Sequence, residues 1–244
     1  AGAASMGMVV FASSFAMFAA GRAFEQIRNS IGYPHLNVKI GATHGGISVG
    51  EDGASHQCCE DFALMRSIPG MVVMSPADDV EAKAAVKAAY AHQGPVYLRF
   101  GRLAVPVLHE EEGFQFEIGK GEVLRDGSDV AIIATGLMVA EAVEAAKVLA
   151  EAGISARVIN ICTIKPLDEE LVVKAAKECG RIIAHFPFLE AAELRERILR
   201  LAAWPVRRIG INDEFGHSGP AAALLKQFGL SAEHIVEVAK EFCR

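Results

Sequence analysis

The sequence predicts an α/β protein with two doubly wound domains, in which helices cover both faces of each sheet. Short runs of β-branched residues alternate with alanine-rich stretches of helical periodicity. The strand-like runs are almost continuously apolar, which is typical of parallel strands buried on both faces. The alternation breaks once, over residues 103–128, and we interpret this break as the boundary between the domains.

The first domain is expected to alternate strands and helices from its start. Asp78 and Glu81 have the spacing of a capping box and should begin a helix that runs to Ala91. The expected strands span 8–13, 36–42, 71–76 and 95–100, and the expected helices span 15–31, 59–68 and 78–91.

The start of the chain is apolar enough to raise the question of a membrane segment. It has no basic leading region, and Ser13, Ser14 and Arg22 interrupt it. We therefore expect a buried strand that enters a helix, and neither a signal peptide nor a membrane span.

The second domain follows a linker with two short extended pieces, an acidic run and no helical pattern. The expected bounds are 1–104 for the first domain, 105–128 for a linker that could hold a hairpin, and 129–244 for the second domain. The expected strands of the second domain span 129–135, 156–161, 181–186 and 205–211, and the expected helices span 138–152, 168–179, 188–202, 219–227 and 231–242.

Composition limits the function classes. A formal charge of −6 argues against a nucleic-acid surface, which needs a concentrated basic face. With 52% hydrophobic and 22% charged residues, the chain should bury a substantial core. The five cysteines form no C-x-x-C pair and are odd in number, which favours a reducing cytoplasm.

The segment most suggestive of function follows the expected strand over 36–42. Residues 43–57 place two histidines, two carboxylates and four glycines within fifteen residues. Ligands of open parallel sheets bind beyond the carboxyl ends of the strands, where this segment should lie. Glycine lets the backbone approach a ligand, and histidine binds phosphate or moves protons near neutral pH. We interpret the segment as a functional loop; the alternative is a surface loop with incidental histidines.

Other chemistries fit the sequence less well. The loop has the glycine spacing of a phosphate loop, but Glu51 stands where that motif needs a lysine. His44 and His56 have no third ligand nearby, so no metal site is predicted. Cys58 and Cys59 could form an activated thiol at a helix start, although buried packing is favoured. The sequence contains no G-x-S-x-G nucleophile elbow.

Three further residues follow strands, on the side where a ligand would bind. Arg102 ends the RFGR stretch and could bind a phosphate through two hydrogen bonds, or form a surface salt bridge. Phe15 and Phe18 follow the first strand; they could stack on a flat ring or belong to the core.

Several segments resemble the transketolase family of thiamine-diphosphate enzymes. SSFAMF, THGGISVGEDGASHQ, RSIPGMVVMSPAD and RFGR resemble its pyrimidine-binding domain. The stretch DVAIIATGLMVAEAVEAAKVLAEAGISARVINICTIKP resembles its C-terminal domain. The likeness covers nearly the whole chain and is strongest to the separate C-terminal subunit of split transketolases. Apart from the histidine-containing loop, it would also suit 1-deoxyxylulose-5-phosphate synthases and the β subunits of 2-oxo acid dehydrogenases.

The resemblance implies a cofactor and a partner. Phe15 and Phe18 match aromatic residues that pack on the aminopyrimidine of thiamine diphosphate, while a third aromatic residue common in the family is replaced by Gly21. The diphosphate and its Mg²⁺ or Ca²⁺ would be bound mainly by an N-terminal subunit that carries the diphosphate-binding domain. Family sites form between chains, so a homodimer or a heterotetramer is expected.

The resemblance also implies a role for each polar candidate. His44 and Arg102 match residues that hold the sugar phosphate, and Asp52 matches a carboxylate that recognises a hydroxyl of the aldose acceptor. His56 matches the catalytic histidine near the reacting carbon. Together these matches imply transfer of a two-carbon ketol unit between sugar phosphates.

Two departures from the family qualify this hypothesis. A family glutamate that bonds the pyrimidine belongs to a segment upstream of the first residue here, so the pyrimidine-binding domain is expected to be truncated at its N-terminus and the chain inactive alone. The region over 184–204 also lacks the family's acidic-histidine, glycine-rich turn. The alternatives are therefore a deoxyxylulose-phosphate synthase-like enzyme, or a non-catalytic assembly or regulatory protein that keeps the fold.

Overall fold

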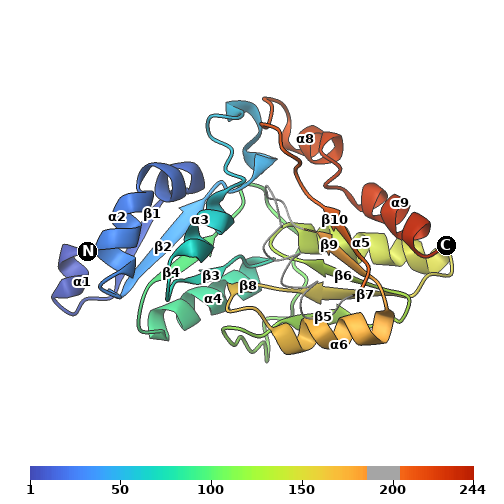
Figure 1. The fold of residues 1–244 in the computed structure, drawn as a ribbon, viewed down its shortest axis with the longest axis horizontal. Helices are drawn as coiled ribbons and strands as arrows, with labels where there is room; N and C mark the ends of the chain where they lie inside the picture. The colour runs from blue at the N-terminus through green and yellow to red at the C-terminus, as the bar shows by residue number, and fades with distance from the viewer. Residues whose placement is uncertain (186–203) are drawn as a thin grey trace.

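The computed structural model describes residues 1–185 and 204–244, which build two five-stranded sheets flanked by helices (Figure 1). The order of the first sheet is β1-β2-β4-β3-β8 and that of the second is β10-β9-β6-β7-β5. The predicted α/β class with two domains is confirmed. Both sheets are mixed, however, because each carries one antiparallel strand at an edge.

The first sheet takes four parallel strands from the first half of the chain and a fifth from the second half. The parallel strands are β1 (Val10–Phe15), β2 (Val38–Thr43), β3 (Val72–Met74) and β4 (Val96–Arg99). β8 (Thr163–Lys165) runs antiparallel to β3. We did not predict β8, because three residues between a strand and a proline give no readable alternation.

The helices of the first half are shorter than predicted. They are α1 (Gly2–Ser5), η1 (Met17–Arg22), α2 (Phe24–Ile27), η2 (Arg28–Gly32), α3 (Asp61–Ser67) and α4 (Asp79–Ala91). The helix expected over 15–31 is divided into α2 and two wider π-helical segments, η1 and η2. Gly21 lies within η1, and Gly32 ends η2, where glycine weakens regular α-helical geometry.

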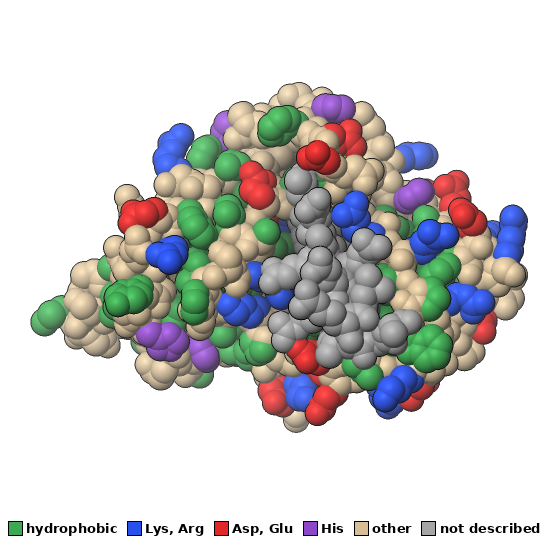
Figure 2. Space-filling view, viewed as in Figure 1, with side chains coloured by type: hydrophobic (Ala, Val, Ile, Leu, Met, Phe, Trp, Pro, Cys, Tyr) green, Lys and Arg blue, Asp and Glu red, His purple; other side chains and the backbone are tan. Residues whose placement is uncertain are grey.

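The prediction of a buried first strand is wrong. β1 pairs only with β2 among the described strands, and residues 11–14 are exposed. Phe11, Met6 and Met8 are exposed as well, and Figure 2 shows hydrophobic side chains scattered over the left part of the molecule, where β1 and α2 lie in Figure 1. An edge strand without covering elements leaves its side chains in solvent.

The start of α4 agrees with the predicted cap. The Asp78 carboxylate accepts a hydrogen bond of 2.9 Å from the backbone N–H of Glu81. The Glu81 carboxylate accepts from the backbone N–H of Ala77 at 2.6 Å, one residue before the position expected in a capping box.

The second sheet contains four parallel strands and one antiparallel edge strand. Its strands are β5 (Glu122–Arg125), β6 (Val130–Ala134), β7 (Ala156–Asn160), β9 (Ile182–His185) and β10 (Val206–Ile209). Its helices are α5 (Met138–Glu151), α6 (Glu169–Cys179), α8 (Ala221–Gln227) and α9 (Ala232–Phe242). β5 lies within the predicted linker and pairs with β7 instead of forming a hairpin there. The expected domain bounds stay predictions.

One expected element and most of one divergent region cannot be compared with the structure. The helix predicted over 188–202 and most of the 184–204 region lie outside the described residues. Among the described helices, none is both long and apolar enough to cross a lipid bilayer.

The two halves of the chain share a core and hydrogen bonds. One buried apolar cluster includes Phe62 of α3 together with Ile133 of β6 and Ile159 of β7. The ammonium group of Lys165 donates hydrogen bonds to two carbonyl oxygens near the end of α3, those of residues 66 and 68. The first domain therefore packs directly on the second.

Candidate functional site

Four aromatic rings meet where β1 and β2 end. The two strands are parallel, and Phe15 is in register with Thr43, so Phe15 and His44 emerge side by side. Their ring centroids are 3.9 Å apart, with planes 9° from parallel. The edge of the His56 ring meets Phe15 at 6.2 Å and Phe18 at 5.4 Å. The structure thus brings together the predicted residues Phe15, Phe18, His44 and His56.

The loop over 43–57 changes direction at glycines with positive φ. It contains the 3₁₀ segment η3 (Ile47–Asp52), interrupted by Gly50 at φ 85°. His44 precedes this segment at φ 60°, a left-handed conformation that costs free energy for a residue other than glycine. Such strain persists only where neighbouring contacts hold the residue in place, and the stacked ring of Phe15 is one such contact.

A buried ion pair lies beneath the start of this loop. The guanidinium of Arg99 on β4 lies 3.1 Å from the carboxylate of Asp61 on α3, and both side chains are almost fully buried. Asp61 also accepts a hydrogen bond of 2.9 Å from the Tyr97 hydroxyl, and burial raises the pKa of that hydroxyl. A Cβ added at Gly45 would lie 2.1 Å from the Arg99 Nε, so the loop can cross the guanidinium only at a glycine.

The second domain supports the other end of the loop. The Gln57 amide donates hydrogen bonds to the carbonyl oxygens of Ile47 at 3.2 Å and His217 at 2.9 Å. Gly53 is in contact with Ser218, where a Cβ would lie 2.3 Å from the serine oxygen. Figure 1 shows the loop and the segment before α8 side by side at the top of the molecule, consistent with contacts between η3 and α8.

The remaining predicted residues are associated with η3: Asp52 belongs to it and Arg102 contacts it. The Arg102 side chain is 43% exposed, and its guanidinium donates a hydrogen bond to the Val49 carbonyl and lies 3.4 Å from the carboxylate of Glu51. Asp52 ends η3 with an exposed side chain. His44 and Arg102, both expected to hold a phosphate, therefore lie at different parts of the loop, His44 at its start and Arg102 against its middle.

Sequence reasoning missed the residues that support the loop. Arg99 and Asp61 could have been noticed, because each interrupts an apolar stretch that should be buried, and a buried charge needs a partner. The contact between Gln57 and the 216–219 segment had no such signal, because nothing in the sequence shows which distant segments meet.

The two adjacent cysteines are packed in the interior, as favoured from the sequence. Both are buried, and burial raises the pKa of both thiols, that of Cys59 to about 12. A thiol with so high a pKa is a poor nucleophile near neutral pH. Over residues 1–185 and 204–244, no three or more His, Cys, Asp or Glu side chains are grouped so as to hold a metal ion.

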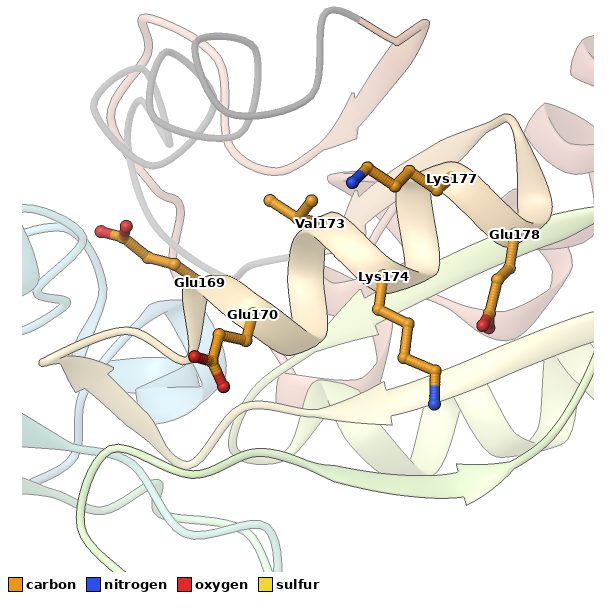
Figure 3. Close-up of a pocket in the computed structure, with 6 residues that line it drawn as sticks. All are labelled: Glu169, Glu170, Val173, Lys174, Lys177 and Glu178. Atoms are coloured by element: carbon orange, nitrogen blue, oxygen red, sulfur yellow. The ribbon is translucent and has the colours of Figure 1, made fainter.

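A mostly apolar cavity opens beside the ring cluster. It has a volume of about 510 Å³, and Phe18 lines it together with Ser13, Ser14, Ile27 and Ile40. A further cavity of about 530 Å³ lies along α6, where lysines and glutamates project around Val173 (Figure 3). Charges of both signs at helical spacing are typical of a solvated helix face. In Figure 1 this helix lies at the bottom of the view and the loop at the top.

Both halves of the chain match sequence models of one family. Residues 1–107 match the model described as the transketolase pyrimidine-binding domain. Residues 119–235 match the model of the transketolase C-terminal domain. The two matches together cover most of the chain.

Known proteins similar to the chain include separate transketolase sections and subunits. A transketolase C-terminal section of Methanocaldococcus jannaschii is 48% identical, over 97% of this chain and 76% of that protein. A 6-deoxy-6-sulfo-D-fructose transketolase subunit of Clostridium sp. (strain MSTE9) is 41% identical, over 99% of this chain and 76% of that protein.

Solved structures give the same result. A structure described as a split gene transketolase, inactive beta4 tetramer, superposes with a TM-score of 0.91 at 45% identity, over 98% of this chain and 78% of that chain. A mutant transketolase of Pichia stipitis superposes with a TM-score of 0.81 at 28% identity, over 96% of this chain and 34% of that chain. With both domain models matched and relatives this similar along the whole length, the chain belongs to the transketolase family.

Proposed function

We propose that the chain is the C-terminal subunit of a thiamine-diphosphate-dependent transketolase. With a partner that carries the diphosphate-binding domain, it would help to move a two-carbon ketol unit from a ketose phosphate to an aldose phosphate. The observation that supports this proposal most is the convergence of Phe15, Phe18, His44 and His56 at the carboxyl ends of β1 and β2. That is the edge at which parallel sheets bind ligands.

The residues around Phe18 suit the pyrimidine end of the proposed cofactor. The rings of Phe15 and Phe18 are inclined by only 20°, and a mostly apolar cavity opens beside Phe18. A flat heterocycle can pack against such a surface. When bound, thiamine diphosphate would supply the carbanion chemistry, with its diphosphate and Mg²⁺ or Ca²⁺ held mainly by the partner.

The polar residues would orient the sugar phosphate. Arg102 and His44 offer N–H donors for the phosphate, and the exposed Asp52 carboxylate can accept a hydrogen bond from a sugar hydroxyl. His56 belongs to the loop and its ring meets those of Phe15 and Phe18, where it could contact sugar hydroxyls and move a proton at the reacting carbon. Its Nδ1 lies 3.0 Å from the Ser55 hydroxyl, which would orient the imidazole.

Reconstitution tests this proposal. The chain would be mixed with its candidate partner subunit, thiamine diphosphate and Mg²⁺, and ketol transfer from xylulose 5-phosphate would be followed. We expect no turnover by the chain alone and turnover in the mixture. His56→Ala and Asp52→Ala should each lower the rate, whereas His234→Ala, at a half-exposed histidine on α9, should not. An active mixture unaffected by His56→Ala and Asp52→Ala would contradict the assigned site.

A related activity is supported by one group of relatives. The 1-deoxy-D-xylulose-5-phosphate synthase of Heliobacterium modesticaldum is 39% identical, over 90% of this chain and 35% of that enzyme. Turnover of pyruvate with glyceraldehyde 3-phosphate, but not of xylulose 5-phosphate, would favour this second candidate. A stable complex that is inactive with every partner and substrate would favour a non-catalytic assembly or regulatory role.

The proposed assembly is a homodimer or a heterotetramer in the cytoplasm. The five cysteines are all free, which agrees with a reducing compartment. Light scattering of the chain with and without its partner would distinguish the two assemblies.

A further inference from the structure

A polar cavity lies between the two domains, and no residue of the 43–57 loop lines it. It has a volume of about 550 Å³ and is lined by α4, by the 114–122 segment and by the end of β7. Glu81 and Asn160 line this cavity, and we call it the Glu81–Asn160 cavity. None of its lining residues belongs to the proposed transketolase site.

The two residues that give the cavity its name are buried, and Asn160 carries an unpaired acceptor. Glu81 is 3% exposed and Asn160 is 1% exposed. The Glu81 carboxylate accepts hydrogen bonds from the Asn160 side-chain amide at 2.9 Å and from the Ala77 backbone N–H at 2.6 Å. The Asn160 Oδ1 has no hydrogen-bond partner in the described part of the chain. A buried acceptor without a donor costs free energy that a ligand N–H can recover.

The charge of Glu81 is also poorly balanced. Lys120 lines the cavity too, but its ammonium group lies 3.9 Å from Glu170, and no lysine or arginine among the described residues forms an ion pair with Glu81. Burial raises the pKa of the Glu81 carboxyl, and the hydrogen bonds from Ala77 and Asn160 and the nearby His109 only partly oppose this rise. A positively charged ligand group would supply that missing partner.

The walls favour a flat and partly apolar ligand. Phe114 and Phe116 line the cavity beside Glu122, whose carboxylate lies 3.1 Å from the Nε2 of His109. The centroid of the Phe114 ring lies 4.7 Å from that of the His109 ring, so Phe114 packs on a second ring beside the cavity. Aromatic walls stabilise flat cations through their π-faces.

We propose that the Glu81–Asn160 cavity binds a small flat organic cation rich in N–H donors, such as an amidinium or aryl-ammonium compound. The cationic group would donate to the Asn160 Oδ1 and the Glu81 carboxylate, and the ring would pack against Phe114 and Phe116. The occupied cavity would connect α4 of the first domain to β5 and β7 of the second. Such a ligand would therefore stabilise the arrangement of the two domains.

Calorimetric titration of the 244-residue chain with benzamidine tests this proposal. We expect saturable binding with one site per chain. Glu81→Gln keeps the side-chain shape but removes the charge, and should weaken binding roughly tenfold to a hundredfold, the range of a charge-assisted hydrogen bond. Glu151→Gln, at the exposed end of α5, should bind benzamidine as the unmodified chain does.

A ligand pair makes the test independent of any variant. Benzamide has nearly the shape of benzamidine but no charge, so it should bind the unmodified chain at least about tenfold more weakly. This comparison still decides the question if Glu81→Gln does not fold. Equal affinity for both compounds, equal affinity of Glu81→Gln and the unmodified chain, or no saturable binding of benzamidine would each overturn the proposal.

Discussion

The side-chain amide of Gln57 donates a hydrogen bond of 2.9 Å to the carbonyl oxygen of His217, which lies 160 residues later in the chain. The same amide donates to the Ile47 carbonyl. One side chain therefore connects two parts of the 43–57 loop and also connects that loop to the second domain. A Cβ at Gly216 would lie 1.8 Å from the Gln57 Oε1, which shows how closely the two segments pack. The geometry of the candidate site therefore depends on the C-terminal domain as well as on the sheet that carries the loop.

Replacing Gln57 should loosen this connection. Gln57→Leu leaves two carbonyl oxygens without their donor, one of them buried, and should lower the free energy of unfolding by about 1–3 kcal/mol. Urea denaturation measures the change. Gln93→Leu is the matched control, because Gln93 makes one exposed hydrogen bond and its loss should cost less than about 0.5 kcal/mol. Equal effects of the two substitutions would contradict a supporting role for Gln57.

The ion pair beneath the loop gives a larger expected effect. Arg99→Met leaves the buried Asp61 carboxylate without its counter-charge and should lower the free energy of unfolding by about 3–5 kcal/mol. Adding Asp61→Asn to Arg99→Met removes the stranded charge and should restore part of the loss. Lys83→Met breaks only exposed ion pairs, with Asp79 and Glu111, and should cost less than about 1 kcal/mol. If the double variant were no more stable than Arg99→Met, the loss of stability could not be attributed to the uncompensated charge of Asp61.

Much of the fold could be predicted from the sequence, because its main elements repeat clear patterns. The strands over 36–42 and 129–135 and the helix after Asp78 have apolar runs or cap signals that the structure confirms. The prediction failed where tertiary context decides the outcome. β1 is apolar but exposed, because burial depends on whether another element covers the edge of the sheet.

Less of the candidate site could be predicted. The glycines and histidines of 43–57 indicated a functional loop, and the structure places both His44 and His56 against the ring of Phe15. The supporting contacts of Gln57 depend on the packing of one domain on another, which local patterns do not encode. The position of Arg102 was predicted only as a strand end, and its hydrogen bond to the loop had no sequence signal.

Lys39 should make stability depend on alkaline pH. Its ammonium group is buried and donates to the carbonyl oxygens of His92 and Gly94 at 2.8 and 2.6 Å. Burial lowers the pKa of Lys39 from 10.5 to about 8. Between these two pH values the unfolded chain keeps a proton that the folded chain has lost, so this residue makes the free energy of unfolding rise with pH in that window.

The contribution of Lys39 can be isolated by comparison with variants. Denaturation at several pH values between about 8 and 10.5 would be compared for the unmodified chain, Lys39→Met and Lys87→Met. Lys39→Met should lack the rise assigned to Lys39, whereas Lys87→Met, which removes an exposed lysine of α4, should keep it. The same pH dependence in Lys39→Met and the unmodified chain would contradict the lowered pKa.

Arg102 should determine the affinity for the phosphate of the sugar in a reconstituted enzyme. Arg102→Gln removes a charged donor, and should raise KM for an aldose phosphate acceptor roughly tenfold to a hundredfold while kcat changes little. The same substitution also removes the hydrogen bond to the Val49 carbonyl, so a disturbed loop could mimic the effect. An acceptor with a hydroxyl in place of the phosphate separates the two causes. If only the phosphate contact is lost, the KM for this second acceptor stays unchanged. If the loop is disturbed, the KM rises for both acceptors. Arg208→Gln, at an exposed arginine of β10, should change neither.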